Sequence, residues 1–415
     1  MPSIAYFNFI STNRRFIAFG LLMAFASSFG QTYFIGILGP GIQAEFSLSH
    51  TDWGTVYMIG TLASAVLLPW TGKLVDRVDL KIYTLLVCLS LILACVFVSI
   101  VNSVAVLVFA IFLLRQSGQG LMSHVAITSM ARYFNTDRGR AIAVASLGFS
   151  AGEAFLPFMA VLAIAAVGWR WIYGGTAALL LFGLIPTVFW LLRGHNERHR
   201  IYLERSSASS VAFKGIYDRS WTRAQVLRDL RFYLLLPGLL APSMILTAMF
   251  FHHLNLADAK GWTHAWITGS YGIYASATIL TSLVSGLTID RIGAVRLVPF
   301  MLVPLILAMV VAAKFVAPWT AWLYLILAGI NIGVVHTAVS AFWVEIYGVQ
   351  NVGAIRSMVS SLGVLSSALG PVIMGTLMDR GLSIENVCLL FAGYTVVGAA
   401  LIILAFTIQP MSAKT

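Results

Sequence analysis

The segment Gly72-Lys73-Leu74-Val75-Asp76-Arg77-Val78-Asp79-Leu80-Lys81 separates two long apolar stretches and concentrates charge between them. A similar segment, Gly286-Leu287-Thr288-Ile289-Asp290-Arg291-Ile292-Gly293, follows about half a chain length later. Both segments read Gly-x-x-x-Asp-Arg, and both end an apolar run. A pattern that recurs at half the chain length indicates two halves related by duplication.

Each copy admits two interpretations. The purely structural one is a charged turn that anchors helix ends at the membrane surface. The functional one gives Gly72 and Gly286 a role in close helix packing. It also lets Asp76 and Asp290 accept hydrogen bonds from helix N-terminal amides or pair with arginine. The matched positions of the two copies favour the functional interpretation.

The composition indicates a protein that lies in a lipid bilayer. Hydrophobic residues make up 59% of the 415 residues and charged residues 10%, with a mean hydropathy of +0.90. A soluble domain carries about 25% charged residues. The three cysteines Cys88, Cys95 and Cys388 lie in apolar runs without metal-type spacing, so we expect inert core residues and no metal. We expect no cleaved signal peptide, because the first apolar run lacks a small-residue cleavage site.

Twelve apolar stretches are long enough to cross the bilayer, at about 20 residues each. They run over residues 16–41, 51–71, 81–101, 104–131, 140–165, 171–193, 232–255, 264–288, 295–316, 319–346, 354–378 and 386–408.

The distribution of Lys and Arg predicts the orientation of these spans. With a cytoplasmic N-terminus, only Arg170, Lys260, Lys314 and Arg380 lie outside, and Arg115 lies within a span. The other Lys and Arg residues of the 26 fall in cytoplasmic segments. We therefore expect a multi-pass protein of the cell membrane, the inner membrane in a bacterium, with both termini cytoplasmic. Topology accounts for the net charge of +11, so no nucleic-acid partner is needed.

The longest polar stretch, 194–231, divides the chain into two sets of six spans. We predict a first six-helix bundle over 1–193, a cytoplasmic linker over 194–231 and a second bundle over 232–415. Residues Ser206–Ser210 have the composition of a flexible linker. Residues 221–228 predict a short amphipathic helix, with Trp221 and Leu227 able to lie in the headgroup layer and the arginines against anionic lipid.

The two loops resemble the signature between helices 2 and 3, and 8 and 9, of the major facilitator superfamily, Gly-x-Leu-x-Asp-Arg-x-Gly-Arg-Lys/Arg. Asp79 replaces the second glycine here, and Leu80 the first basic residue. Two further segments agree: Arg115–Gly120 resembles the family's Arg-x-x-Gln-Gly-x-Gly with a shifted order, and Arg138–Ala141 is similar to its Arg-Gly-x-Ala.

The resemblance implies an all-α membrane protein whose twelve helices form two pseudo-symmetric six-helix bundles. It implies a secondary transporter, symporter or antiporter, that works by alternating access without a cofactor. It also assigns conformational gating to the two loops, at Gly72, Asp76, Arg77, Gly286, Asp290 and Arg291.

Arg115 is the leading candidate for substrate contact, because a charge within the membrane must face a cavity or a partner. Glu153 lies at a similar predicted depth in the next span, so an Arg115–Glu153 pair is geometrically allowed. Three roles remain open: a structural ion pair, substrate binding by Arg115, and proton carriage by Glu153. Gln119 lies one helical turn after Arg115 and shares its face, for substrate contact or for an interhelical hydrogen bond.

The resemblance also implies that spans one, four, seven and ten line the cavity. Each of the polar residues in these spans can alternatively be a packed, hydrogen-bonded core residue. The substrate-site candidates are Gln31, Thr32, Tyr33, His252, Asn331 and His336. His253 adjoins His252, but consecutive side chains point about 100° apart and do not easily face one ligand.

No phosphate-binding loop, zinc-spaced set or nucleophile elbow occurs in the sequence, so we expect a transporter and not an enzyme. The leading hypothesis is transport of a small organic anion or metabolite bound near Arg115 by a monomer in the bilayer, with H⁺ or another ion as the coupling partner. The alternative is a proton-coupled exporter of amphipathic compounds. Exporters of this kind carry adjacent Gly-Pro in span five, whereas Glu153 follows Gly152 here. A sensor that has lost transport is the remote alternative.

Overall fold

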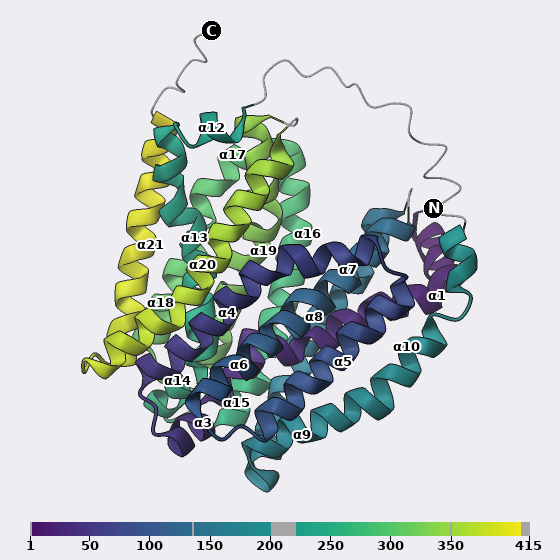
Figure 1. The fold of residues 1–415 in the computed structure, drawn as a ribbon. Coiled ribbons are helices and arrows are strands. Elements are labelled where there is room, and N and C mark those ends of the chain that lie inside the picture. Colours follow the sequence, from purple (N-terminus) through teal and green to yellow (C-terminus); the bar gives the residue numbers. More distant parts are fainter. Residues whose placement is uncertain (1, 135–136, 201–220, 349–350, 408–415) are drawn as a thin grey trace. The chain divides into compact units, whose positions relative to one another are not determined.

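The computed structural model describes residues 2–134, 137–200, 221–348 and 351–407 (Figure 1). Within these ranges the chain is helical and contains no strand. The predicted flexible segment Ser206–Ser210 lies outside the described residues.

In the first half of the chain, four short segments labelled η depart from α-helix geometry: η1 and η2 are 3-10 helices, and η3 and η4 are π-helices. The helical elements of this half are α1 Pro2–Ala26, η1 Ser27–Gly30, α2 Thr32–Gly36, α3 Gly39–Phe46, α4 His50–Gly72, η2 Lys73–Asp76, α5 Leu80–Ser99, α6 Val104–Leu114, η3 Arg115–Met122, α7 Ser123–Tyr133, α8 Arg138–Val167, α9 Trp169–Leu179, η4 Leu180–Leu184 and α10 Ile185–Leu191.

In the second half the elements are α12 Arg223–Val226, α13 Leu230–Phe251, α14 His253–Lys260, α15 His264–Gly269, α16 Tyr271–Ile292, α17 Ala294–Leu297, η5 Val298–Phe300, α18 Val303–Lys314, α19 Thr320–Tyr347, α20 Val352–Asp379 and α21 Ile384–Thr407.

Among the described residues, twelve helical segments are long and apolar enough to cross a membrane, which confirms the predicted number of spans. Most boundaries agree within a few residues with those predicted from the sequence. The first span differs most: it runs over Phe9–Gly36 rather than 16–41. The span ends at Gly36 because Ile37 and Leu38 form a turn, so that residues 39–46 form the separate helix α3.

The chain divides into two compact units. Unit 1 comprises residues 1–42 and 59–214, and unit 2 comprises residues 43–58 and 215–415. Residues 50–58 at the start of α4 therefore belong to unit 2. The predicted linker boundaries at 194 and 231 stay predictions, since 201–220 lie outside the described residues.

The segment predicted as an amphipathic helix over 221–228 forms only the four-residue helix α12. Thr222 and Gln225 close a capping box at its N-terminus. Trp221 packs against Tyr347 at 5.4 Å between ring centroids, and its backbone N–H donates to the Tyr347 carbonyl. The indole therefore packs on unit 2, and the ability of Trp221 to lie in the headgroup layer stays a prediction.

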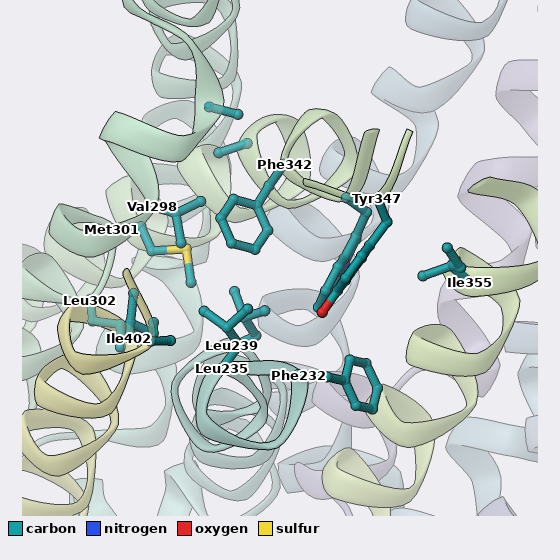
Figure 2. Packing of buried hydrophobic residues seen from close by; sticks show 14 of the residues in the cluster. Phe232, Leu235, Leu239, Val298, Met301, Leu302, Phe342, Tyr347, Ile355 and Ile402 are labelled. Carbon is teal, nitrogen blue, oxygen red and sulfur yellow. The ribbon is translucent and has the colours of Figure 1, made fainter. Parts of the chain in front are cut away.

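The core of unit 2 lies where α13, α19 and α21 meet η5 (Figure 2). Leu235 and Leu239 of α13 lie near Phe342 of α19 in this cluster, whereas Phe232 lies on the side of Tyr347. Figure 1 shows α13, α18, α19, α20 and α21 running alongside one another in this unit. Large apolar side chains on the outside, such as Phe182 and Phe300, are 76% and 69% exposed, as expected where lipid replaces water.

In unit 1, α8 packs on α1 through Gly148 and Gly152. A methyl group on Gly148 would lie 2.1 Å from the carbonyl oxygen of Leu21. One on Gly152 would collide with the hydroxyl of Ser28. Small residues let helix backbones approach closely inside a membrane, where the hydrophobic effect contributes little to association.

Replacement of Gly148 by alanine should therefore separate α1 from α8 and lower the thermal unfolding temperature of the purified protein. Gly139 supplies a matched control on the same helix, since a methyl group there meets nothing within 4 Å. Gly139→Ala should leave stability unchanged or raise it by up to about 1 kcal/mol through helix propensity. Equal unfolding temperatures for the two variants would contradict the packing argument.

Candidate functional site

The first membrane span is broken near its end. The α-helix stops at Ala26, a 3-10 turn covers Ser27–Gly30, and Gln31 is extended, with ψ of 154°. Helix resumes at Thr32. Such a break leaves backbone carbonyls without their usual partners, and inside a membrane each needs a donor from the protein.

A second irregular segment packs against this break. Arg115–Met122 is a π-helix between α6 and α7, and the two segments touch through glycines. A methyl group on Gly118 would lie 2.7 Å from the Cα of Gly30, and one on Gly30 would lie 2.2 Å from the Leu114 carbonyl oxygen. The contact is backbone against backbone, and only glycine fits on either side.

Arg115 supplies one of the donors that the break requires. Its Nη1 donates to the Gly30 carbonyl at 3.1 Å and to the Thr32 hydroxyl at 3.4 Å. Tyr173 of α9 donates to the Phe29 carbonyl at 3.0 Å. Arg115 is 2% exposed. The sequence placed Arg115 within a span, but it gave no sign of Tyr173 or of the freed carbonyls.

Tyr33 and Glu153 lie beside the break. The Tyr33 hydroxyl donates to Ser28 Oγ at 2.8 Å, and Glu153 acts electrostatically on Tyr33. Both side chains are partly exposed. Within the described part of the chain, Glu153 forms no ion pair with Arg115, whose guanidinium reaches the α1 break instead.

Gln31 and Gln119 border the same region. Both are partly exposed, and the Gln119 backbone nitrogen lies 2.9 Å from the position of a methyl group on Gly30. The interhelical hydrogen bonds that were one alternative for Gln119 are made instead by the buried Gln116. It accepts from Ser64 at 2.9 Å and donates to Thr71 at 2.8 Å. Gln116 was missed because the sequence does not show where the π-helix shifts the register.

The adjacent histidines His252 and His253 of unit 2 are buried and have separate partners. His252 Nε2 lies 3.0 Å from the Pro371 carbonyl oxygen. His253 Nδ1 lies 2.7 Å from the Tyr271 hydroxyl, with the two rings stacked at 5.2 Å. Burial lowers the pKa of His252 to about 4 and that of His253 to about 3.

Asn331 and His336 of α19 differ in their surroundings. Asn331 is completely buried and donates to the Met301 carbonyl at 2.7 Å, where η5 gives way to α18. His336 is exposed. Of these two candidates, His336 is therefore accessible. Asn331 is part of the packed interior of unit 2.

In the first copy of the loop, the helix that follows is capped by Asp79. Its carboxylate accepts from the amides of Lys81 and Ile82 at 2.9 and 3.4 Å. Gly72 ends α4, and Arg77 is exposed. Arg132 of α7 donates to the Val75 carbonyl at 2.9 Å. The residue that departs from the family pattern, Asp79, is thus the N-cap of α5.

In the second copy the cap comes from a distant residue. Glu345 of α19 accepts from the amides of Ala294 and Val295 at 2.8 and 3.0 Å. Gly293, with φ of +83°, turns the chain from α16 into α17 directly against this carboxylate. Gly286 lies inside α16, and a methyl group there would meet nothing within 4 Å, so the close packing expected at Gly286 is wrong. Asp290 and Arg291 are exposed. Sequence reasoning missed Glu345, since nothing near it indicates a loop 50 residues upstream.

The sequence profile of the Major Facilitator Superfamily matches residues 20–326. Comparison with curated proteins gave no match. Among solved structures, a bacterial homolog to the human lysosomal transporter Spinster, inward-facing and occupied, is similar with a TM-score of 0.69 at 14% identity, over 95% of this chain and 97% of that chain. Its unoccupied form gives 0.67 at 15% identity over the same shares. A mutant of the nucleoside transporter NupG gives 0.69 at 15% identity, over 94% and 99%. At such identities these structures establish the fold alone.

Replacing Glu345 by alanine should destabilise unit 2 by about 1 kcal/mol, because two amides at the start of α17 lose their acceptor. Asp290→Ala removes the same charge from an exposed position and should have little effect. Thermal unfolding of both variants tests this expectation. A greater loss of stability in Asp290→Ala than in Glu345→Ala would show that Asp290, and not Glu345, stabilises the second copy of the loop.

His253 should make the stability of the protein depend on pH. A free imidazole has a pKa of about 6.5. Below about pH 6.5 the histidine of the unfolded chain therefore binds a proton, whereas the buried ring of the folded protein stays neutral. Stability should fall as pH drops from about 6.5 toward 3, by about 2 kcal/mol at pH 5 for this residue. The loss of unfolding temperature between pH 7.5 and 5.0 should shrink in His253→Phe. It should persist in His264→Gln, a control at a more exposed histidine, and an undiminished loss in His253→Phe would contradict the assignment.

Proposed function

Because the chain belongs to the Major Facilitator Superfamily, we propose that it is a secondary transporter that moves a small organic anion past Arg115 by alternating access. It is an integral, multi-pass membrane protein with a small-molecule substrate, as the family and the twelve apolar helices indicate. The finer parts of the proposal concern the substrate class, the residues that hold it and the coupling.

The observation that carries the proposal is a cation buried at a broken membrane helix. Binding sites of secondary transporters form where membrane helices are discontinuous, near the middle of the bilayer. Arg115 lies at such a break, and Gln31, Thr32 and Tyr33 beside it are partly exposed. A carboxylate or phosphate can replace the Gly30 carbonyl as acceptor and offers two oxygens to the planar guanidinium.

Glu153 supports the alternative, a proton-coupled exporter of amphipathic compounds. A carboxylate beside Tyr33, with no ion pair to Arg115 in the described residues, is free to exchange a proton as the site opens and closes. The same residue also suits an anion symporter, in which Glu153 carries the coupling proton. In both cases Gln119 and His336 are secondary candidates for substrate contact, one in each unit.

The two loops are proposed to gate the transition between states, with Asp76 and Arg77 in the first copy and Asp290 and Arg291 in the second. The capping carboxylates Asp79 and Glu345 hold the ends of the neighbouring helices at these loops. We further propose that both termini and both loops are cytoplasmic, as the Lys and Arg distribution predicts, and that the monomer is functional.

A thermal-shift screen of the purified protein against carboxylates, phosphate esters and cationic amphiphiles identifies a ligand, because binding to the folded state raises the unfolding temperature. In proteoliposomes, Arg115→Gln should abolish uptake of an anionic ligand, and Arg115→Lys should retain part of it, since lysine keeps the charge but loses the fork. Arg140→Gln, an exposed arginine paired with Asp137, is the control and should transport normally.

Glu153→Gln separates the two coupling roles in the same assay. If Glu153 carries the proton, this variant should exchange ligand at equal concentrations but lose accumulation driven by a pH gradient. Normal uptake in both Arg115→Gln and Glu153→Gln, or a ligand set made up only of cations, would refute the anion site at Arg115.

A further inference from the structure

A cavity of about 220 Å³ lies between the first part of α1 and the end of α10 in unit 1. Arginines converge on it from both elements and from the residues after α10. We call it the arginine cavity and define it by Arg14, Arg15, Phe16, Arg193, His195 and Arg198. Its volume is below the roughly 300–1,000 Å³ of pockets for drug-sized ligands, so it suits a single small group.

The positive charge of the arginine cavity is not neutralised by acidic residues of its own lining. Among the described residues that line it, none is acidic, and none of its four arginines forms an ion pair in the described part of the chain. The carboxylate that acts on His195 is Asp79, which already caps α5. Four positive charges around a small cavity make a site for an anion.

Two of the arginines are held in place by aromatic rings. The Arg198 guanidinium lies 4.2 Å from the ring centroid of Phe16, and that of Arg15 lies 5.3 Å from the Trp190 ring. A guanidinium that stacks on a ring still presents its N–H groups at the edge. These two side chains are therefore oriented in advance, and Arg14 and Arg193 are exposed and able to close over a ligand.

His195 is the second, independent sign of a ligand. It lines the cavity, is 3% exposed, and neither ring nitrogen has a hydrogen-bond partner among the described residues. Gly194, with φ of +79°, turns the chain sharply after α10 and brings His195 onto Phe16, where the rings stack at 5.9 Å. Burial lowers the pKa of His195 to about 4, so the ring is neutral near pH 7 and has one N–H to donate.

We propose that the arginine cavity binds an anionic phosphate group, with the arginines around its oxygens and His195 as an additional donor. Guanidinium groups match phosphate geometry through paired N–H donors. An unpartnered buried imidazole costs free energy that a ligand oxygen recovers.

The phosphate has two possible sources, a lipid headgroup and a soluble phosphate. The position of the cavity favours the lipid: Phe189 and Trp190, at the end of α10, are each about half exposed, and aromatic side chains at the ends of membrane spans lie at the headgroup level. Anionic lipids gather at the cytoplasmic leaflet, which the proposed topology places on this side.

The test uses full-length protein stripped of lipid in a neutral detergent. Binding of short-chain phosphatidylglycerol, of a diacylglycerol with the same chains and of inorganic phosphate is measured by microscale thermophoresis at constant ionic strength. Phosphatidylglycerol should bind and diacylglycerol should not. Binding of phosphatidylglycerol alone identifies a lipid site, and binding of inorganic phosphate as well identifies a site that also takes soluble phosphate.

Arg14→Gln combined with Arg193→Gln changes only exposed side chains, so folding should be preserved, and phosphatidylglycerol should bind about thirtyfold more weakly. Arg140→Gln, combined with Arg200→Gln, removes two exposed arginines outside the cavity as the matched control and should bind normally. His195→Phe keeps the stacked ring but removes the donor, and should weaken binding severalfold. Equal binding of diacylglycerol, no binding of either phosphate compound, or an equal loss in the control would overturn the proposal.

Discussion

The backbone carbonyls released by the break in α1 constrain the interior of unit 1. In a bilayer they cannot be left to water, so each must receive a hydrogen bond from the protein. Tyr173 reaches the Phe29 carbonyl from α9, and Arg115 reaches the Gly30 carbonyl from the π-helix. These two long side chains come from different elements, which fixes both α9 and the π-helix against the break.

The same constraint explains why the irregular segments occur together. A π-helix widens the turn and shifts the register of the side chains that follow it. Here it brings Gly118 against Gly30 without a methyl group on either side and leaves Arg115 directed at the break. A regular helix with any larger residue at Gly118 would push the two spans apart and leave the carbonyl of Gly30 without its donor.

Arg115 therefore has a structural task in this state, and that task is compatible with substrate binding. A single guanidinium N–H bond to a carbonyl is weaker than a bidentate pair with a carboxylate. In the proposed function, an anion that enters beside Thr32 would compete for the guanidinium and release the carbonyl of Gly30, which would couple occupancy of the site to the conformation of the α1 break. The structural and functional interpretations of Arg115 differ in whether this exchange occurs, not in where the residue lies.

The sequence predicts those features of the structure that depend on neighbouring residues, and it does not predict those that depend on contacts between residues far apart in the chain. Span number and most span ends depend on local apolar length, and they agree closely. Asp79 had a local signal too, an aspartate directly before an apolar helix. The break at Ser27–Gln31 and the π-helix at Arg115 depend on each other across 85 residues, and a sequence pattern does not encode that pairing.

The two copies of the loop show most clearly that a shared sequence pattern does not determine which residue caps the following helix. Its two copies share Gly-x-x-x-Asp-Arg, yet α5 is capped by a residue of the loop itself and α17 by Glu345 from α19. Gly293 occupies the equivalent of the position held by Asp79, and a glycine there has no carboxylate to cap with but allows the positive φ that brings α17 onto Glu345. The acceptor is required in both copies because the helix that follows must satisfy its first amides. What the duplication preserved is thus the need for a carboxylate at the helix start, and each half of the chain meets that need with a different residue.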